Sequence, residues 1–314
     1  MKAILEVKDL VKKYGDFAAV KGISFDIKEG EIFSLLGPNG AGKTTTISVL
    51  STLYAPTSGD ATIGGHSVTK EPMAVRNLIG VVPQELALYD DLTAHENLVF
   101  WGQMYGLSGK NLKTRVDEVL EQIGLKDRAK ERVKAYSGGM KRRVNIGVGL
   151  LHKPRLLFMD EPTVGIDPQS RRAILDSVED LNKQGMTVLY TTHYMEEAEE
   201  LSDRVGIIDH GELIALGTQA ELTRQVGEEE TLILHIGEDE DGEALATLLK
   251  SVPGVLQATA VDHEVSVIAR EAEEIITPVI TRANERGIKI HSVDMREPNL
   301  EAVFLHLTGR ALRD

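Results

Sequence analysis

The sequence GPNGAGKTT at residues 37–45 lies between the apolar run EIFSLL (31–36) and the helix-compatible segment TTTISVLSTL (44–53). Its glycines let the backbone turn tightly, so that N–H groups converge on a phosphate at the N-terminus of the following helix. Lys43 adds a positive charge for the β- and γ-phosphates, and Thr44 offers a hydroxyl to Mg²⁺. A glycine turn with a chance Lys-Thr would not require this strand–loop–helix context. We therefore predict a phosphate-binding loop that binds a nucleoside triphosphate.

Composition limits the class of protein. The chain has 314 residues, of which 42% are hydrophobic, enough for one large core and a smaller second domain. A net charge of -14 disfavours a protein that mainly grips phosphate backbones, so we expect no nucleic-acid partner. The start, MKAILEVKD, reaches an acid before a signal-peptide core could form, and no apolar run is long enough to span a bilayer. We expect a cytoplasmic protein, without disulfides because it lacks cysteine.

The order of apolar runs predicts the fold. Short alternating runs before residue 37 read as antiparallel strands, and residues 85–151 have helical periodicity, which indicates an inserted helical subdomain. Apolar strands then alternate with helices, which is typical of a mainly parallel, doubly wound sheet. Ligands of such sheets bind at the carboxyl ends of the strands. Gln84, Asp160 and His193 each follow a predicted strand, so we expect them to converge with the phosphate loop.

A second domain is predicted beyond residue 226. The segments TLILHI (231–236), EALATLLKSV (243–252), VLQATAV (255–261), EVSVIA (264–269), EEIITPVITRANERG (273–287) and IKIHSVDM (288–295) have the order βαββαβ. This order is typical of a small α+β ferredoxin-like unit. A last helix follows, capped by Asn299. We assign residues 1–226 to an ATP-binding domain and 227–314 to an accessory domain.

Two further segments carry chemistry. The strand LLFMDE (156–161) delivers two carboxylates at its tip, Asp160 for the Mg²⁺ shell and Glu161 as the base that activates water. Without the phosphate loop, such a pair would more often be a solvated turn. Ser137 and the two glycines after it begin a helix and offer a second anion site, unless they only cap that helix.

With these residues in place, the sequence resembles an ATP-binding cassette (ABC) transporter ATPase over roughly residues 1–225. GPNGAGKTT matches the family's Walker A loop and LLFMDEP its Walker B strand. VVPQE matches the Q-loop, YSGGM (136–140) the signature, VGID (164–167) the D-loop, and the histidine of TTHYMEEAEELSDRV the switch histidine. The signature is the most specific match, because other P-loop proteins lack it. The resemblance implies an ABC-type P-loop α/β core with an antiparallel β subdomain.

The resemblance also implies the roles of residues. His193 would contact the γ-phosphate and hold the geometry of the attacking water, and Gln84 would reach Mg²⁺ and that water. The signature would close on ATP held by a second copy, with Asp167 across the interface, so the protein would work as a homodimer. Tyr14 is expected to stack against adenine. The expected ATP-binding residues are Tyr14, Gly37, Pro38, Asn39, Gly40, Ala41, Gly42, Lys43, Thr44 and Thr45, and the residues expected to act on the partner's ATP are Ser137, Gly138, Gly139 and Asp167. The expected Mg²⁺ ligands are Thr44, Gln84 and Asp160. The expected catalytic residues are Glu161, His193 and Gln84.

Three residues depart from the usual family motifs. Tyr136 and Met140 stand at the ends of the signature, where Leu and Gln are usual. YSGGM is similar to the form found in the daunorubicin-resistance branch of ABC exporters, which the carboxy-terminal sequence EPNLEAVFLHLTGRALRD also resembles. Ile166 replaces the usual Leu of the D-loop, a change that conserves volume.

These observations predict the cytoplasmic ATPase subunit of an ABC transporter, which would use ATP and Mg²⁺ to drive export. It would be held at the inner face of the cell membrane by binding a separate multi-span permease. One alternative is a soluble ABC ATPase of an assembly or translation system. Another is a P-loop kinase, which would not explain YSGGM or His193. The accessory domain would either stabilise the dimer or regulate access to the ATP sites, and the cargo stays open.

Overall fold

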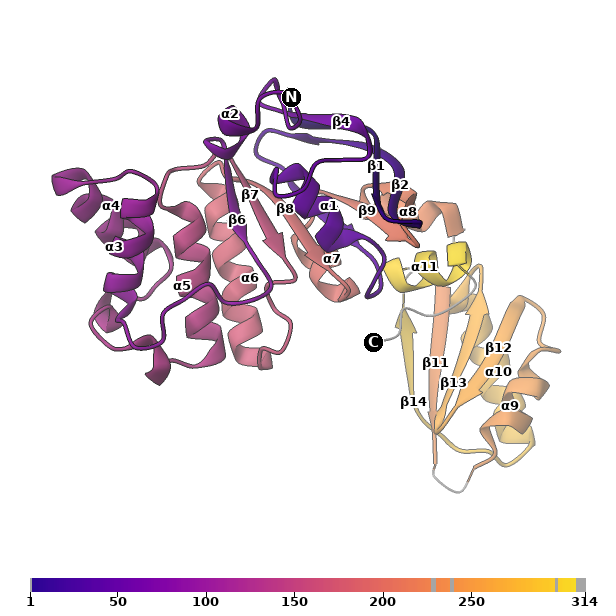
Figure 1. Ribbon diagram of the computed structural model, residues 1–314. Helices are drawn as coiled ribbons and strands as arrows, with labels where there is room; N and C mark the ends of the chain where they lie inside the picture. Colours follow the sequence, from indigo (N-terminus) through magenta and orange to yellow (C-terminus); the bar gives the residue numbers. More distant parts are fainter. Residues whose placement is uncertain (1, 227–229, 238–239, 297–298, 309–314) are drawn as a thin grey trace. The chain divides into compact units, whose positions relative to one another are not determined.

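The computed structural model describes residues 2–226, 230–237, 240–296 and 299–308. The chain forms two compact units, and the boundary in the sequence falls between Thr218 and Gln219. Figure 1 labels most of their elements. Helix α8 (Gln219–Val226), which the sequence placed in the first domain, packs against α11 (Leu300–Thr308) of the second unit. Residue 227, the predicted start of the accessory domain, lies outside the described residues, as do 309–314.

The first unit contains two sheets. Its main sheet has the strand order β10-β9-β3-β8-β7-β6, and only the β9–β10 pair is antiparallel. The mainly parallel sheet predicted from the sequence is therefore confirmed. A second, antiparallel sheet has the order β2-β1-β4-β5. The bounds are β1 (Ala3–Tyr14), β2 (Phe17–Lys28), β3 (Ile32–Leu36), β4 (Ser58–Ile63), β5 (His66–Ser67), β6 (Ile79–Val82), β7 (Leu156–Asp160), β8 (Thr187–Thr192), β9 (Arg204–Asp209) and β10 (Glu212–Gly217).

The five parallel strands of the main sheet are buried on both faces, and alternate residues of these strands enter different cores. Leu156 and Phe158 of β7 pack in a core shared with the antiparallel sheet, whereas Leu157 and Met159 pack against the helices of the other face. This period of two follows from the strand geometry. It explains why LLFM is a continuous apolar run rather than an alternating one.

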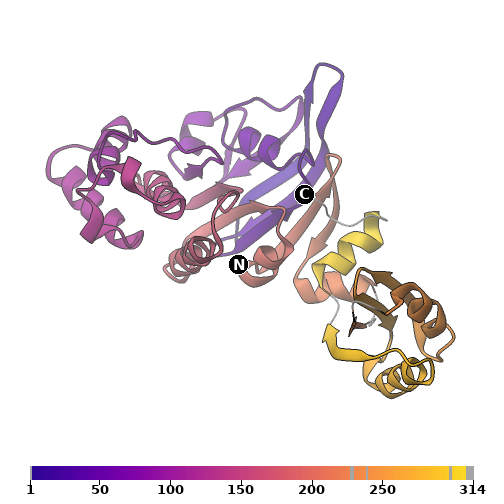
Figure 2. The ribbon, with the colours of Figure 1, turned by 90° about the horizontal axis from the view of Figure 1, so that it is seen from below.

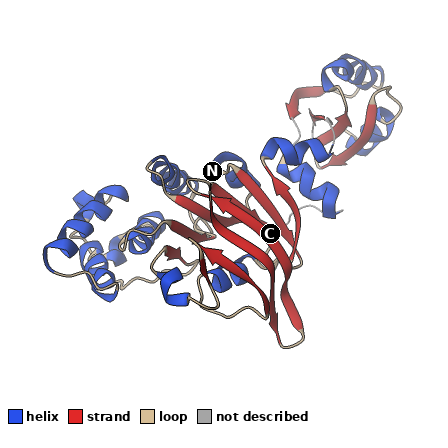
Figure 3. Cartoon of the chain, turned by 90° about the horizontal axis from the view of Figure 1, so that it is seen from above, coloured by secondary structure: helices blue, strands red, loops and turns tan. Residues whose placement is uncertain are grey.

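Helices α3 (Ala94–Met104), α4 (Gly109–Gln122) and α5 (Gly138–Leu150) occupy the predicted helical subdomain. No strand interrupts them in residues 85–151, all of which are described. Figures 2 and 3 show α3 and α4 projecting as a helical lobe beside the sheets. The other helical elements of this unit are α1 (Lys43–Leu50), α2 (Pro72–Arg76), α6 (Pro168–Lys183), α7 (Met195–Leu201) and the short 3₁₀ turns Lys126–Arg128 and Val133–Ala135.

The second unit has the predicted βαββαβ order. Its antiparallel sheet has the strand order β12-β13-β11-β14, and α9 and α10 contribute to one hydrophobic core with it. This arrangement is ferredoxin-like. The side chain of Asn299 caps α11 by accepting the N–H of Ala302, at 3.0 Å, as predicted. The bounds are β11 (Glu230–Ile236), α9 (Gly242–Leu249), β12 (Val255–Val261), β13 (Glu264–Ala269), α10 (Ala272–Glu285) and β14 (Ile290–Arg296).

The first helix of the lobe provides a test of local stability. The Thr93 hydroxyl accepts the Glu96 N–H at 3.1 Å, and the Glu96 carboxylate accepts the Thr93 N–H at 2.8 Å, which forms a capping box. We expect Thr93→Ala to lower the free energy of unfolding by about 1 kcal/mol, measured by urea denaturation. Ser108→Ala is the matched control, because Ser108 precedes α4 without a side-chain capping bond. Equal losses in both variants would contradict this assignment.

Candidate active site

The phosphate loop connects β3 to α1, and two of its glycines are required by the space around them. A Cβ at Gly37 would lie 2.1 Å from the carbonyl oxygen of Ile208. Gly42 has a φ of +112°, and a Cβ there would lie 2.6 Å from the Ala19 carbonyl oxygen. Only glycine fits both constraints. The loop borders a cavity of about 340 Å³ whose lining residues are Tyr14, Phe17, Ala19, Asn39, Gly40, Gly42, Lys43, Thr44, Thr45, Gln84 and Glu161.

A buried charge network closes one side of this cavity. Lys43 Nζ lies 2.9 Å from Glu161 Oε1, and the side chains are only 3% and 7% exposed. The same ammonium donates to the carbonyl oxygens of Gly37 and Pro38, at 2.6 and 3.0 Å. Glu161 Oε2 is 2.9 Å from His193 Nδ1. The loop lysine, the carboxylate and the histidine are therefore in contact before any phosphate is considered.

Glu161 sits in a strained backbone conformation. Its φ of +45° is in the left-handed region, which non-glycine residues seldom occupy. Its N–H is bonded to the Thr191 carbonyl oxygen at 3.1 Å and to the Thr191 hydroxyl at 3.0 Å, which holds this conformation. Such strain is maintained only where the surrounding structure determines it, and it is common at functional sites.

Asp160 and Thr44 offer neighbouring oxygen ligands. The Thr44 hydroxyl donates to Asp160 Oδ1 at 3.1 Å, and the Thr191 hydroxyl donates to the same atom at 2.8 Å. Burial raises the pKa of Asp160, while these hydrogen bonds oppose the rise. A divalent cation would stabilise the buried carboxylate, so the oxygen donors fit Mg²⁺. Among the described residues, no three His, Cys, Asp or Glu side chains form a metal cluster.

The loop that carries Gln84 is held from α5. The Arg142 guanidinium donates to the carbonyl oxygens of Pro83 and Gln84, at 2.9 and 2.7 Å. One helical turn on, the Asn145 amide accepts the Ala87 N–H at 3.2 Å. Because Arg142 is only 4% exposed, this contact is part of the interior. The first turns of α5 therefore fix the position of Gln84.

The signature residues lie elsewhere. Ser137 and Asp167 cap α5 and α6 by accepting the N–H groups of Met140 and Ser170, at 3.2 and 2.9 Å. The Ser170 N–H lowers the pKa of Asp167. A Cβ on Gly139 would lie 2.3 Å from the Ser170 side chain, so the two helix starts are adjacent. The predicted residues Ser137, Gly138, Gly139 and Asp167 thus gather together, but they do not line the cavity at the phosphate loop.

Sequence reasoning missed several residues of this site. Phe17 lines the cavity beside Tyr14 and is 66% exposed, so it is a second candidate for stacking on a base. Thr191 binds Asp160 and Glu161, and Arg142 binds the loop of Gln84. Thr191 lies in an apolar strand two residues before His193, and Arg142 lies two residues after the signature. These positions were the only available signals.

Comparisons with known proteins identify a family and relatives that this chain resembles. A family model described as ABC transporter matches residues 20–164. The Linearmycin resistance ATP-binding protein LnrL of Bacillus subtilis is 50% identical over 313 residues, which cover 99% of this chain and 100% of that protein. The Daunorubicin resistance ATP-binding protein DrrA3 of Streptomyces coeruleorubidus is 39% identical over 301 residues, covering 95% of this chain and 93% of that protein.

Solved structures agree with these relatives. A structure described as the ATP binding subunit of an ABC transporter is 33% identical, with a TM-score of 0.63, and covers 71% of this chain and 93% of its own. A dimeric ATP-binding cassette bound to ADP and Pi in a post-hydrolysis state is 29% identical, with a TM-score of 0.61. It covers 68% of this chain and 98% of its own.

Thr191 can be tested against a threonine on the same strand. Thr187, at the other end of β8, also accepts a backbone N–H, that of Gly30, at 2.9 Å. We expect Thr191→Val and Thr187→Val each to lower the free energy of unfolding by about 1 kcal/mol, because each removes a buried hydroxyl that accepts a backbone N–H. Only Thr191→Val should also lower the rate of ATP hydrolysis, measured by phosphate release. A similar loss of rate in Thr187→Val would contradict the specific role.

Proposed function

The chain belongs to the ABC transporter family as an ATP-binding and ATP-hydrolysing subunit, and we propose that it works as a homodimer that powers export through a separate membrane permease. The observation that carries the proposal is the contact of Lys43, Glu161 and His193 beside the phosphate loop. This arrangement offers a phosphate-binding cation, a base and a γ-phosphate sensor in one place. This arrangement does not require the acceptor substrate that a kinase would phosphorylate.

The proposed hydrolysis assigns one task to each group. Lys43 and the loop N–H groups bind the β- and γ-phosphates. Glu161 accepts a proton from the attacking water, and His193, bonded to Glu161, fixes the water and the γ-phosphate. Thr44, Asp160 and Gln84 would hold Mg²⁺, which neutralises charge on the phosphate oxygens. Tyr14, which lines the cavity and is 45% exposed, would stack on adenine.

A homodimer is proposed because the residues expected at ATP are divided between two surfaces of one chain. The phosphate loop and Glu161 border the cavity, whereas Ser137 and Asp167 stand at the starts of α5 and α6. A second copy would bring the N-terminus of its α5 to the γ-phosphate. The dimeric state of a related cassette supports this arrangement.

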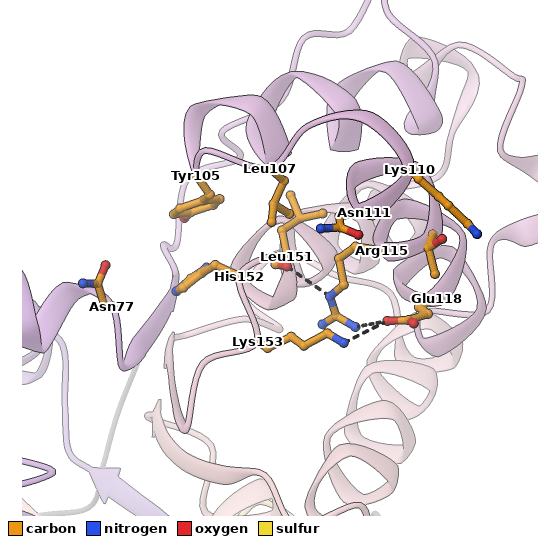
Figure 4. Close-up of a pocket in the computed structure, with 11 residues that line it drawn as sticks. Asn77, Tyr105, Leu107, Lys110, Asn111, Arg115, Glu118, Leu151, His152 and Lys153 are labelled. Carbon is orange, nitrogen blue, oxygen red and sulfur yellow. Dashed lines mark hydrogen bonds and ion pairs between the residues drawn. The ribbon is translucent and has the colours of Figure 1, made fainter.

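The proposed contact for the permease is a groove between α4 and the residues that follow α5 (Figure 4). This groove has a volume of about 690 Å³. Tyr105 and His152 stack on one wall, with ring centroids 4.3 Å apart. On the other side, Arg115 pairs with Glu118 and donates to the carbonyl oxygens of Leu150 and Leu151 at the end of α5. An apolar wall beside charged groups suits a cytoplasmic segment of a permease that has both apolar and charged side chains.

Helix α5 connects the groove to the ATP cavity. Leu151 and His152, which line the groove, follow its last turn, whereas Arg142 near its start binds the carbonyl oxygen of Gln84. A movement of this helix changes both places, because packed elements move as units. This is the proposed route between nucleotide state and permease.

No helix in the described parts of the chain is long and apolar enough to cross a membrane. We propose that the permease binds the protein at the inner face of the membrane.

The names of relatives guide the proposed direction. They include linearmycin and daunorubicin resistance proteins and a Nod factor export protein of Ralstonia nicotianae, which is 38% identical over 312 residues. We therefore propose export of an organic compound.

The C-terminal unit is proposed to stabilise the dimer.

Replacing the base tests the hydrolytic role. We expect Glu161→Gln to lower the turnover of ATP on the order of a hundredfold or more, because the amide cannot accept the proton of water. Binding of ATP, measured by equilibrium dialysis, should persist. Near-normal phosphate release from the purified variant would refute the role of Glu161.

The permease can be sought with the same variant. We expect tagged Glu161→Gln, trapped with ATP and extracted in mild detergent, to copurify with a stoichiometric multi-span protein. Leu107→Asp, in the groove, should abolish that copurification, because it places a charge on the apolar wall. Leu53→Asp is the control, because Leu53 is 67% exposed and outside the groove. Recovery with ribosomes or soluble assembly proteins alone would refute the transporter partner while the ATPase activity stands.

A further inference from the structure

Two side chains that the proposed mechanism does not use are stacked behind His193. The ring of Tyr194 lies 4.2 Å from the His193 ring, centroid to centroid, with the planes tilted by 39°. On the Tyr194 ring lies the guanidinium of Arg171, whose Cζ is 4.2 Å from the ring centroid. A cation at this distance from an aromatic face is attracted by the ring quadrupole. Arg171, Tyr194 and His193 therefore form one continuous stack.

A buried carboxylate anchors this stack. Glu197 is 2% exposed, and its Oε2 accepts the hydroxyls of Tyr190 and Thr192, both at 2.9 Å. Its Oε1 faces Arg171 Nε at 3.6 Å, an ion pair rather than a hydrogen bond. Burial, followed by the nearby charge of Glu197, raises the pKa of Tyr190 well above its usual value. The Tyr190 hydroxyl therefore stays protonated and continues to donate to Glu197.

The same anchor fixes the backbone on both sides of His193. The Thr192 hydroxyl, which donates to Glu197, accepts the N–H of Tyr194 at 2.9 Å. The backbone around His193 is thereby tied to α7, on which Glu197 lies. What remains to be set is the orientation of the imidazole ring, and the Tyr194 face is in contact with it.

Arg171 extends this arrangement to the start of α6. The backbone N–H of Arg171 donates to the Asp167 carbonyl oxygen at 2.8 Å, in the first turn of the helix. Asp167 caps this helix. A displacement of this turn moves the guanidinium that covers Tyr194. The helix start that carries Asp167 and the ring of His193 are therefore connected through two side chains.

We propose that Arg171 and Tyr194 are positioning residues that hold the His193 imidazole against Glu161 and make its orientation depend on the start of α6. This inference rests on the proposed role of His193 in hydrolysis. Neither residue lines the cavity at the phosphate loop. Their effect is therefore on the geometry of the step that follows ATP binding.

The test compares two adjacent arginines in the full-length protein. Arg171→Met removes the cation but keeps a long side chain, whereas Arg172→Met is the matched control, because Arg172 pairs with Asp176 and Glu200. We expect Arg171→Met to lower kcat about tenfold or more, since small misplacements of catalytic groups have effects of this size. The KM for ATP should stay within about twofold. Tyr194→Leu should behave like Arg171→Met, and Tyr194→Phe, which keeps the ring, should retain kcat.

A second measurement reports on His193 directly. In ¹⁵N-histidine NMR spectra, with the His193 signal assigned from His193→Ala, we expect Arg171→Met to shift that signal and Arg172→Met to leave it in place. An unchanged kcat and an unshifted signal in Arg171→Met would overturn the proposal. A rise in KM without a fall in kcat would overturn it as well. Normal turnover in His193→Ala and Glu161→Gln would instead refute the proposed hydrolytic mechanism itself, so the two failures are distinct.

Discussion

The buried ion pair between Lys43 and Glu161 is the interaction on which the arrangement of the first unit depends. Lys43 begins α1, after the phosphate loop that follows β3, and Glu161 directly follows β7. Strands β3 and β7 are separated in the sheet by β8. Two charges at 2.9 Å with exposures of 3% and 7% attract each other with little screening. Removing either partner would leave a buried, unpaired charge, which costs about 3–5 kcal/mol. The relative positions of the three strands are therefore part of the site.

Glu161 illustrates how much of the fold serves one side chain. Its left-handed backbone is maintained by two hydrogen bonds from its N–H to Thr191, and that threonine is fully buried on the neighbouring strand. The strand is held in turn by apolar residues that alternate between two cores. The strain costs on the order of 1–3 kcal/mol, and two dense cores supply the rigidity that maintains it. A loosely packed sheet would allow the carboxylate to relax away from Lys43.

The sequence predicted this site well at the tips of strands and poorly between elements. Lys43, Gln84, Asp160 and Glu161 follow apolar strands, so the rule for carboxyl ends of parallel sheets brings them together. The geometry agrees with that expectation, while the catalytic tasks of these residues stay predictions. Arg142 and Arg171 were missed because their partners lie on other elements and depend on side-chain packing. A helix pattern indicates which face is buried, but not which carbonyl a buried guanidinium will meet.

The division of the site between two helix starts explains why one chain is an incomplete enzyme in the proposed mechanism. Ser137 and Asp167 cap α5 and α6 side by side, and the same helices carry Arg142, which holds the Gln84 loop, and Arg171, which covers Tyr194. A partner that contacts these helix starts therefore presses on two elements that reach back to the chain's own ATP cavity. Closure of the dimer would then complete the partner's site and orient Gln84 and His193 in this one. Because packed helices move as units rather than deform continuously, such a coupling favours two discrete states. Hydrolysis in the proposed cycle would thus be restricted to the closed dimer by the packing of α5 and α6, without a separate regulatory element.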